Sequence, residues 1–146
     1  MRYVIVSTIL AVLAAGSARA ACTDSVAALA ARQAIAAQCP CRTATSHAQF
    51  VDCAASVTDD RISHGMLPAS CRSGVVFCAN KSICGTPNRV TCCIPRRDGR
   101  IRCKLKRSAQ ACADRGGTVT GTNATGCTSC CDACPAGRTG PSCGPS

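Results

Sequence analysis

Apolar residues recur at helical spacing in the first half of the chain and alternate with polar residues in part of the second half. The first such segment, 24–38, is alanine-rich with a thin apolar stripe, and it predicts a helix with Thr23 as N-cap and Asp24 at the positive end. The stripe consists of Val26, Leu29 and Ile35. A helix of this length holds Cys22 and Cys39 about 25 Å apart at 1.5 Å per residue, so these two cysteines cannot bond to each other.

Two more helices follow in the predicted fold. Ser46 and Gln49 form a capping-box pattern, which predicts a helix at about 47–64. A third helix, at about 68–80, begins with Pro68, which suits a first helical turn. The residues that repeat along one stripe of this third helix are Cys71, Val75 and Cys78.

The apolar pattern then changes to a period of two. Two alternating runs flank a turn signal at Pro95–Gly99, which predicts a β-hairpin at about 89–106. The alternating residues are Val90, Cys92, Ile94, Ile101, Cys103 and Leu105. We expect these six side chains to share one face, with Cys93 pointing the other way. The outer face of the second strand would then carry Arg100, Arg102, Lys104 and Lys106.

The remaining segments are short. Ser108 is a suitable N-cap for a helix that ends near Arg115. The Thr-, Gly- and Asn-rich stretch 118–126 is predicted to be a loop. A cysteine-rich run, 127–134, follows, and a Gly/Pro-rich tail occupies 135–146.

The N-terminus has the features of an export signal. A basic start precedes an apolar run at 4–15, which is too short to span a membrane. Ala18 and Ala20 supply small residues at the positions that a signal peptidase reads, so residues 1–20 are predicted to be a signal peptide. The mature chain would be secreted or periplasmic, with a single cysteine-rich domain at 21–134.

Cysteine content decides the expected fold class. After removal of residues 1–20, only eighteen Val, Ile, Leu, Met or Phe residues remain in 126, too few to offset conformational entropy. Sixteen cysteines in the same length are typical of a secreted disulfide scaffold. We therefore expect a small disulfide-rich α+β fold, with three to four short helices and one β-hairpin stapled by about eight disulfides, whose pairing stays open. The cysteines are Cys22, Cys39, Cys41, Cys53, Cys71, Cys78, Cys84, Cys92, Cys93, Cys103, Cys112, Cys127, Cys130, Cys131, Cys134 and Cys143.

Positive charge gathers on the predicted hairpin. The whole chain has a net charge of +10, and the segment 89–107 contains eight basic residues against one acid. A cationic stripe of this kind is suited to phosphates of lipopolysaccharide or nucleic acid and to acidic glycans, although it lacks aromatic residues that stack on bases. The alternative is a solvated edge strand whose charges prevent sheet-to-sheet association.

The run Cys-x-x-Cys-Cys-x-x-Cys is a candidate metal site. On a helix, Cys127, Cys130, Cys131 and Cys134 would share one face, and four thiolates at this spacing suit zinc or an iron–sulfur cluster. In an exported protein these cysteines are expected to be oxidised, and disulfides do not ligate metals. We therefore expect no metal and no cofactor.

No catalytic constellation is visible in the sequence. His47 and His64 fall near the two ends of one predicted helix, and Asp59 and Asp60 are adjacent rather than facing across a cleft. There is no Ser/His/Asp order, phosphate-binding loop or nucleotide motif. We therefore expect a protein that is not an enzyme and that has no catalytic residues.

The chain resembles a group of secreted, cysteine-rich bacterial proteins with no established activity. The resemblance covers about 39–134 and rests on CPC at 39–41, His47, Phe50, Val51, Cys53, Cys84, Gly85, Cys92, Cys93 and Cys-Cys-Asp-Ala-Cys at 130–134. It implies secretion and a helix-plus-hairpin fold. It transfers no site residue to this chain.

Two functional hypotheses follow. The first is a secreted, non-enzymatic, disulfide-stapled module, structural or protein-binding, whose extracellular partner the sequence does not identify. The second is a cationic binder of envelope or extracellular polyanions through the 89–107 hairpin. Further alternatives are a protease inhibitor that presents the loop 95–99, with Arg96 and Arg97 suited to a trypsin-like pocket, and a metal-binding protein that uses the four cysteines at 127–134.

Overall fold

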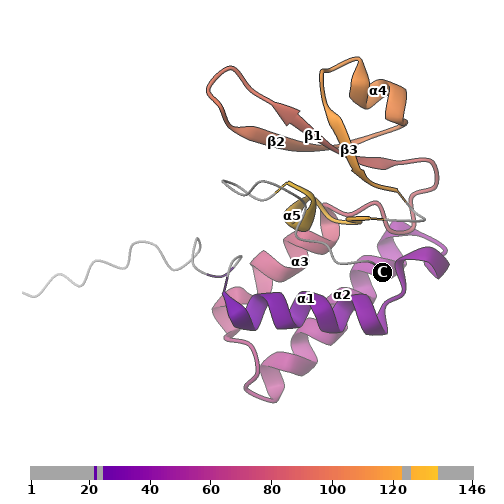
Figure 1. The fold of residues 1–146 in the computed structure, drawn as a ribbon. Helices are drawn as coiled ribbons and strands as arrows, with labels where there is room; N and C mark the ends of the chain where they lie inside the picture. Colours follow the sequence, from indigo (N-terminus) through magenta and orange to yellow (C-terminus); the bar gives the residue numbers. More distant parts are fainter. Residues whose placement is uncertain (1–21, 23–24, 123–125, 135–146) are drawn as a thin grey trace, which may run out of the picture.

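The computed structural model describes residue 22, residues 25–122 and residues 126–134. The predicted signal peptide and the tail 135–146 lie outside the described residues. Helices occupy the first part of the fold, and a three-stranded sheet with two short helices occupies the second (Figure 1). The elements are α1 (Val26–Gln38), η2 (Cys41–Thr43), α2 (His47–Ser63), η3 (Ala69–Cys71), α3 (Arg72–Asn80), β1 (Val90–Pro95), β2 (Ile101–Lys106), α4 (Ala109–Ala113), β3 (Thr118–Gly121) and α5 (Cys130–Ala133).

The helix α1 begins two residues later than the sequence predicts. Ser25, rather than Thr23, is the N-cap, and its side-chain oxygen accepts a hydrogen bond from the Ala28 N–H at 3.2 Å. This bond satisfies one of the N–H groups that a first helical turn leaves without a partner. The buried face consists of Ala28, Ala31 and Ile35. Val26, which the apolar stripe placed inside, is 85% exposed, so α1 packs mainly through small side chains.

The second predicted helix is confirmed as α2, with a modified cap. Ser46 Oγ accepts a hydrogen bond from the Gln49 N–H at 3.2 Å, as in a capping box. Gln49 Oε1 does not return to Ser46. It accepts instead from the N–H of Thr45 at 3.0 Å and from the Thr45 hydroxyl at 2.7 Å. Gly65 follows the helix with a φ of +69°, a backbone conformation that glycine adopts without a Cβ clash.

The third predicted helix is divided near its start. Pro68 precedes the single 3-10 turn η3, and the α-helix α3 begins only at Arg72. Cys71 and Cys78 are both buried, as their shared stripe predicts. Arg72 donates hydrogen bonds from Nε and Nη2 to the two carboxylate oxygens of Asp59, at 2.5 and 2.8 Å, which ties α3 to α2.

The larger hydrophobic core lies among α1, α2 and α3 and contains few large side chains. Phe50, Leu67 and Ile35 are its bulkiest buried members. Three disulfides between described cysteines close this region: Cys22–Cys71, Cys39–Cys53 and Cys41–Cys84. The expectation that α1 keeps Cys22 and Cys39 from bonding to each other is confirmed.

The predicted hairpin forms, but its predicted register is wrong by one residue. Cys93 lies opposite Cys103, and Cys92 lies opposite Lys104. Because directly paired residues of antiparallel strands share a face, the six alternating residues divide between the two faces of the sheet. One face carries Val90, Cys92 and Ile94 with Arg102, Lys104 and Lys106; the other carries Cys93 with Ile101, Cys103 and Leu105.

The length of the hairpin loop sets this register. Pro95 lies opposite Ile101, so the loop contains the five residues 96–100. The Arg96 N–H donates to the Arg100 carbonyl at 2.8 Å and closes the loop directly beyond that pair. Loop length and turn geometry fix register in a hairpin, and a shift of one residue moves every side chain to the opposite face.

A third strand is present where the sequence predicts only a loop. β3 pairs antiparallel with β1, with Cys92 opposite Val119 and Cys93 opposite Thr118, which gives the sheet the order β2-β1-β3. The sequence Thr-Val-Thr has high strand propensity, but a run this short indicates a strand only when a partner is known. The assignment of 118–126 to a loop is therefore wrong for its first four residues.

A smaller core lies between the sheet and α4. The predicted cap of α4 is confirmed, since Ser108 Oγ accepts from the Ala111 N–H at 3.1 Å. Cys112 of α4 bonds to Cys92 of β1. The residues of this core are Val90, Cys92 and Cys112, with Ile94 and Val119 packed against them.

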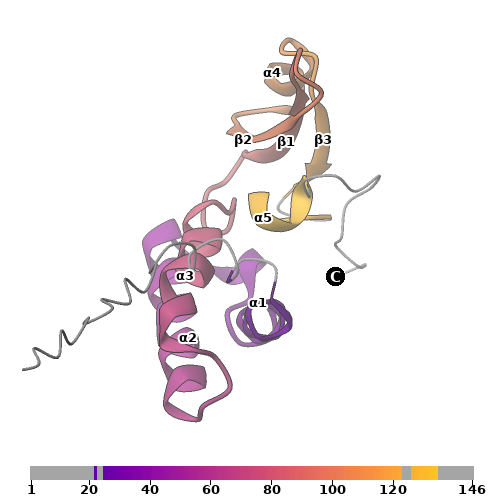
Figure 2. The same cartoon turned by 90° about the vertical axis from the view of Figure 1, so that its left-hand side faces the viewer.

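The short helix α5 joins the helical part to the sheet. It lies between α1–α3 and the strands in both views (Figure 1, Figure 2). Three disulfides of this segment reach three different elements: Cys103–Cys130 to β2, Cys78–Cys131 to α3 and Cys93–Cys134 to β1. Ser129 Oγ also donates to the Cys78 carbonyl at 2.8 Å, and the Cys130 N–H donates to the Lys81 carbonyl at 2.9 Å.

The predicted fold class is confirmed. Seven disulfides join cysteines of the described residues, which contain three longer helices, two short ones and a three-stranded antiparallel sheet. This is a small disulfide-rich α+β protein. Within 25–122 and 126–134, none of the helices has the length and apolar character needed to cross a membrane.

Candidate functional site

Three of the four predicted polyanion-binding residues lie together on one face of β2. Arg102, Lys104 and Lys106 alternate along the strand, so successive members are about 6.8 Å apart. We call these three residues the basic face. Arg100 lies in the loop before β2, where its backbone N–H donates to Asp98 Oδ1 at 3.1 Å.

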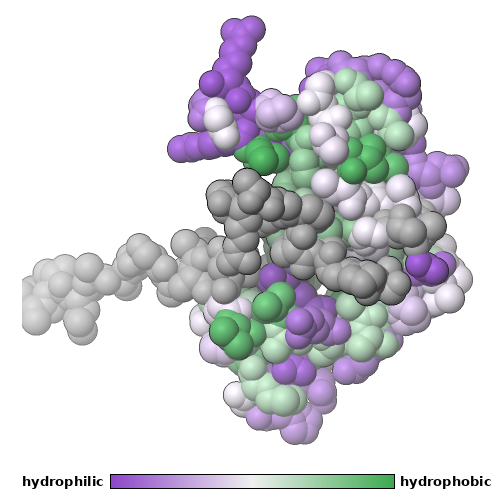
Figure 3. Space-filling view, viewed as in Figure 1, coloured by the Kyte–Doolittle hydropathy of each residue, from purple (hydrophilic) through white to green (hydrophobic). Residues whose placement is uncertain are grey.

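The basic face belongs to an edge strand. β2 pairs only with β1 in the described sheet, so its other edge has no partner strand there. Arg102 and Lys104 are exposed, and Lys106 is half-buried. Among the described residues, no carboxylate lies within ion-pair distance of any basic side chain between Arg89 and Arg107. The hairpin accordingly forms a hydrophilic projection, at upper left in Figure 3.

The register places the basic face beside a packed surface. Cys92 shares this side of the sheet and is fully buried, because its disulfide to Cys112 brings α4 over β1 and β3. α4 therefore covers the apolar part of this side and leaves the cations of β2 next to it. The basic face is therefore a short row of cations along the edge of the sheet, directly beside the part that α4 covers.

The cysteines at 127–134 do not form the predicted four-thiolate cluster. Only Cys130–Ala133 is helical, and the sulfurs of Cys130, Cys131 and Cys134 are bonded to three different elements. Cys127 is disulfide-bonded as well. Disulfide sulfurs are not the thiolates that zinc requires, so this segment acts as a covalent junction.

The two histidines lie at opposite ends of α2, as the sequence predicts. His47 Nδ1 lies 2.9 Å from the Cys84 carbonyl oxygen. His64 Nδ1 lies 2.8 Å from the Asp60 carbonyl oxygen and 3.4 Å from Asp60 Oδ1, in the last turn of the helix. His64 thus contacts the backbone of its own helix, and His47 contacts the backbone of a distant segment. The structure does not bring the two histidines together.

The loop proposed for protease inhibition is a compact turn. The hydrogen bond between the Arg96 N–H and the Arg100 carbonyl closes the loop. Within the loop, the Gly99 N–H donates to the Arg96 carbonyl at 3.1 Å. Arg96 and Arg97 are exposed. Peptides that dock on another protein through main-chain hydrogen bonds do so in an extended conformation, so this turn does not favour the inhibitor hypothesis.

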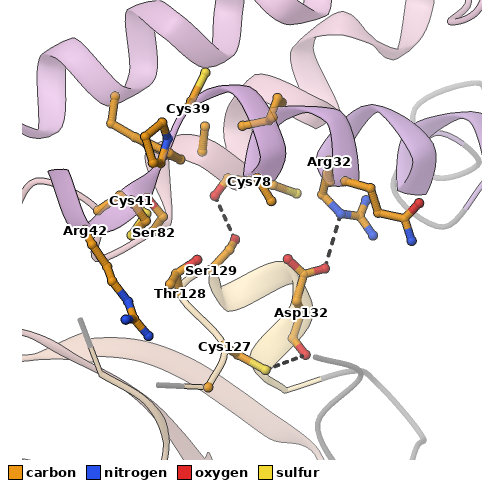
Figure 4. A pocket seen from close by; sticks show the side chains of 18 of the residues that line it. Arg32, Cys39, Cys41, Arg42, Cys78, Ser82, Cys127, Thr128, Ser129 and Asp132 are labelled. Atoms are coloured by element: carbon orange, nitrogen blue, oxygen red, sulfur yellow. Dashed lines mark hydrogen bonds and ion pairs between the residues drawn. A yellow bond between two sulfur atoms is a disulfide. The ribbon is translucent and has the colours of Figure 1, made fainter. Parts of the chain in front are cut away.

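The structure contains a cleft that the sequence analysis did not predict (Figure 4). It has a volume of about 580 Å³ and lies among α1, α3 and the segment 126–132, with mostly apolar walls. Arg32 and Asp132 form an ion pair at one end of it, with 3.2 Å between Arg32 Nε and Asp132 Oδ1. Arg42 lies at the other end in this view.

Burial governs the ionisation of Asp132. Loss of hydration raises the pKa of this carboxyl above its usual 3.8, and the charge and hydrogen bond of Arg32 oppose the rise. The two residues are 100 positions apart in the chain, so no local pattern in the sequence joins them. The pair holds α5 against α1, and we assign it a structural role.

Comparisons with protein-family models, with curated proteins and with solved structures give no match to this chain. The functional inference therefore rests on the residues of this chain.

Proposed function

We propose that this protein is an exported, disulfide-stapled, non-enzymatic module that binds acidic polymers through the basic face. The observation that carries the proposal is the alignment of Arg102, Lys104 and Lys106 on an edge strand, without a carboxylate at ion-pair distance among the described residues. Cations spaced about 6.8 Å apart along a strand can meet successive phosphates or sulfates of an extended polymer.

The rigidity of the hairpin supports this proposal. β2 is tied to α5 through Cys103–Cys130, and its partner strand is tied on both faces, through Cys92–Cys112 and Cys93–Cys134. A strand held in this way loses little conformational freedom when it binds, and such preorganisation reduces the entropic cost of association.

The cysteine chemistry supports export. Disulfides persist in oxidising compartments, and the sequence begins with a signal-peptide pattern. The acidic polymers present outside a cell include phosphate-bearing lipopolysaccharide and acidic glycans. Because the hairpin has no aromatic residue for base stacking, recognition would rest on charge, which favours these polymers over nucleic acid.

Heparin chromatography with two charge-matched variants tests the proposal. The first variant, Arg102→Gln/Lys104→Gln/Lys106→Gln, removes the basic face. The second removes three exposed arginines elsewhere: Arg96→Gln/Arg97→Gln/Arg115→Gln. We expect the first variant to elute at clearly lower salt than the second. Equal elution of the two variants would show that retention depends on net charge alone, and the proposed site would be rejected.

A further inference from the structure

A second cleft lies between the helical part and β2, and it is lined throughout by described residues. Its volume is about 600 Å³. Phe77, Asn80 and Lys81, at the end of α3, form one wall, and Cys103–Leu105 of β2 with Cys130 and Cys131 of α5 form another. His47, Ser82, Thr86 and Arg89 complete the lining.

The charge of this cleft is positive. Lys81, Arg89 and Lys104 line it, and no carboxylate is among its lining residues. Lys81 and Arg89 are exposed, and neither lies at ion-pair distance from a described carboxylate. By register, the side chain of Lys104 belongs to the basic face on the opposite side of β2. We therefore attribute the cationic character of the cleft to Lys81 and Arg89.

An exposed aromatic ring stands beside these charges. Phe77 is 54% exposed, whereas Val75 on the same helix is buried. Lys81 Nζ lies 5.6 Å from the centroid of the Phe77 ring, within cation–π range. This contact keeps an ammonium group next to an apolar surface, an arrangement that suits a ligand with one charged and one apolar end.

Ser82 lies between the two clefts and is among the lining residues of both. Its side chain is almost fully buried, at 1% exposure, and its Oγ finds no hydrogen-bond partner within the described part of the chain. Buried hydroxyl groups in folded proteins are normally hydrogen-bonded, and one without a partner is destabilising. The Oγ atom is itself enclosed by protein and is not accessible from the cleft, so we give Ser82 no part in ligand binding.

We propose that this cleft binds a phosphate monoester carried on an apolar or ring-shaped group. A phosphate monoester has a charge of about −1.5 to −2 at neutral pH, which matches the two cations Lys81 and Arg89. Its oxygens accept hydrogen bonds from the side chains of Lys81 and Arg89, and the attached group packs on Phe77. The proposal does not rest on the polymer-binding function, because it uses the other side of β2.

Calorimetric titration with phenyl phosphate tests the proposal on the full mature chain. We expect phenyl phosphate to bind about tenfold more tightly than inorganic phosphate, because its ring packs on Phe77. A factor of ten corresponds to about 1.4 kcal/mol of binding free energy. Lys81→Gln and Arg89→Gln should each weaken binding by about tenfold, a typical effect of losing a charge-assisted hydrogen bond. Arg97→Gln removes the same charge outside the cleft and should leave affinity unchanged.

Two further variants compare the exposed ring with the enclosed hydroxyl. Phe77→Ala should reduce the affinity for phenyl phosphate to that for inorganic phosphate. Ser82→Ala removes a hydroxyl that the ligand does not reach, so it should leave the affinity for phenyl phosphate unchanged. Equal loss of affinity in Arg97→Gln, or equal binding of phenyl phosphate and inorganic phosphate, would overturn the proposal.

Additional titrations distinguish two natural classes of phosphate monoester. Glucose 6-phosphate represents a soluble sugar phosphate, and dihexanoyl phosphatidic acid represents a lipid headgroup with its acyl chains. Tighter binding of one of them identifies the source. If neither binds more tightly than inorganic phosphate, the proposed ligand class is wrong.

Discussion

Cys93 and Cys103 lie directly opposite each other in the hairpin, yet they do not bond to each other. Cys93 bonds to Cys134 and Cys103 bonds to Cys130, so both strands are attached to the segment around α5. A bridge between the two cysteines would join only neighbouring strands. The observed pairing instead connects the hairpin to α5, which Cys131 links to α3 through Cys78.

Disulfide mapping tests this pairing directly. We expect partial reduction and alkylation of the protein, followed by peptide mass analysis, to yield Cys93–Cys134 and Cys103–Cys130 pairs and no free thiol. The intact mass should be lower than that of the reduced chain by two hydrogens per bridge. A peptide that links Cys93 to Cys103 would contradict the structure.

Full reduction is expected to unfold the protein. The larger core contains few bulky side chains, and each bridge typically contributes about 2–4 kcal/mol by restricting the unfolded chain. Far-UV circular dichroism and protease sensitivity, measured before and after reduction and alkylation, report the change. A reduced chain that keeps its helical signal and its protease resistance would show that the cores are sufficient without the bridges.

Gly85 and Gly65 offer a matched test of a close approach between segments. Their φ angles are +67° and +69°, but a Cβ at Gly85 would overlap the Ser46 carbonyl group, whereas one at Gly65 would meet nothing within 4 Å. Gly65→Ala should cost about 1–2 kcal/mol from the backbone conformation alone. Gly85→Ala should cost about 3 kcal/mol or more, since the packing of residues 84–86 on α2 must also open. Equal losses in urea denaturation would contradict this packing.

The half-buried carboxyl of Asp132 predicts a specific pH dependence. Burial raises its pKa in the folded protein above the usual 3.8, so the folded state binds this proton more tightly than the unfolded state. The wild type should therefore lose stability relative to Asp132→Asn as pH rises from about 3.8 through the raised pKa. Urea denaturation between about pH 3 and pH 7 measures the difference.

Asp59 supplies a control in which stability changes with pH in the opposite direction. The hydrogen bond from Arg72 lowers its pKa below 3.8, so its contribution to stability is present above that pH and is lost as pH falls. The wild type should thus lose stability relative to Asp59→Asn on acidification. If the stability difference between wild type and variant changes with pH in the same direction for Asp132→Asn and Asp59→Asn, the environment assigned to Asp132 is wrong.

The helices and the hairpin were predictable because their signals are local. Capping hydroxyls at Ser46 and Ser108, and the alternation on either side of the loop, act within a few residues of the structure that they specify. The strand β3 was not predictable in this way, because Thr118–Gly121 is a strand only through its pairing with β1. The hairpin register was missed since it depends on how many residues the loop contains.

The candidate site was only partly visible in the sequence. The alternation predicted one charged face of four cations. The structure places Arg102, Lys104 and Lys106 there, whereas Arg100 lies in the loop before β2. Their neighbours were predicted wrongly, because the register error put Cys92 on the opposite side. The two clefts depend on contacts between distant segments, such as Arg32 with Asp132, and no local pattern indicates them.

The most direct test of polymer binding by the basic face is the salt dependence of its affinity for a defined heparin oligosaccharide. By analogy with nucleic acid, each neutralised anionic group contributes about 0.7–0.9 to the slope of log K against log salt concentration. We expect Arg102→Gln/Lys104→Gln/Lys106→Gln to reduce the slope by about 2. We expect Arg96→Gln/Arg97→Gln/Arg115→Gln to change it much less. A wild-type slope in the first variant, with its fold intact by circular dichroism, would contradict the account and leave the basic face as a strand edge that only resists association.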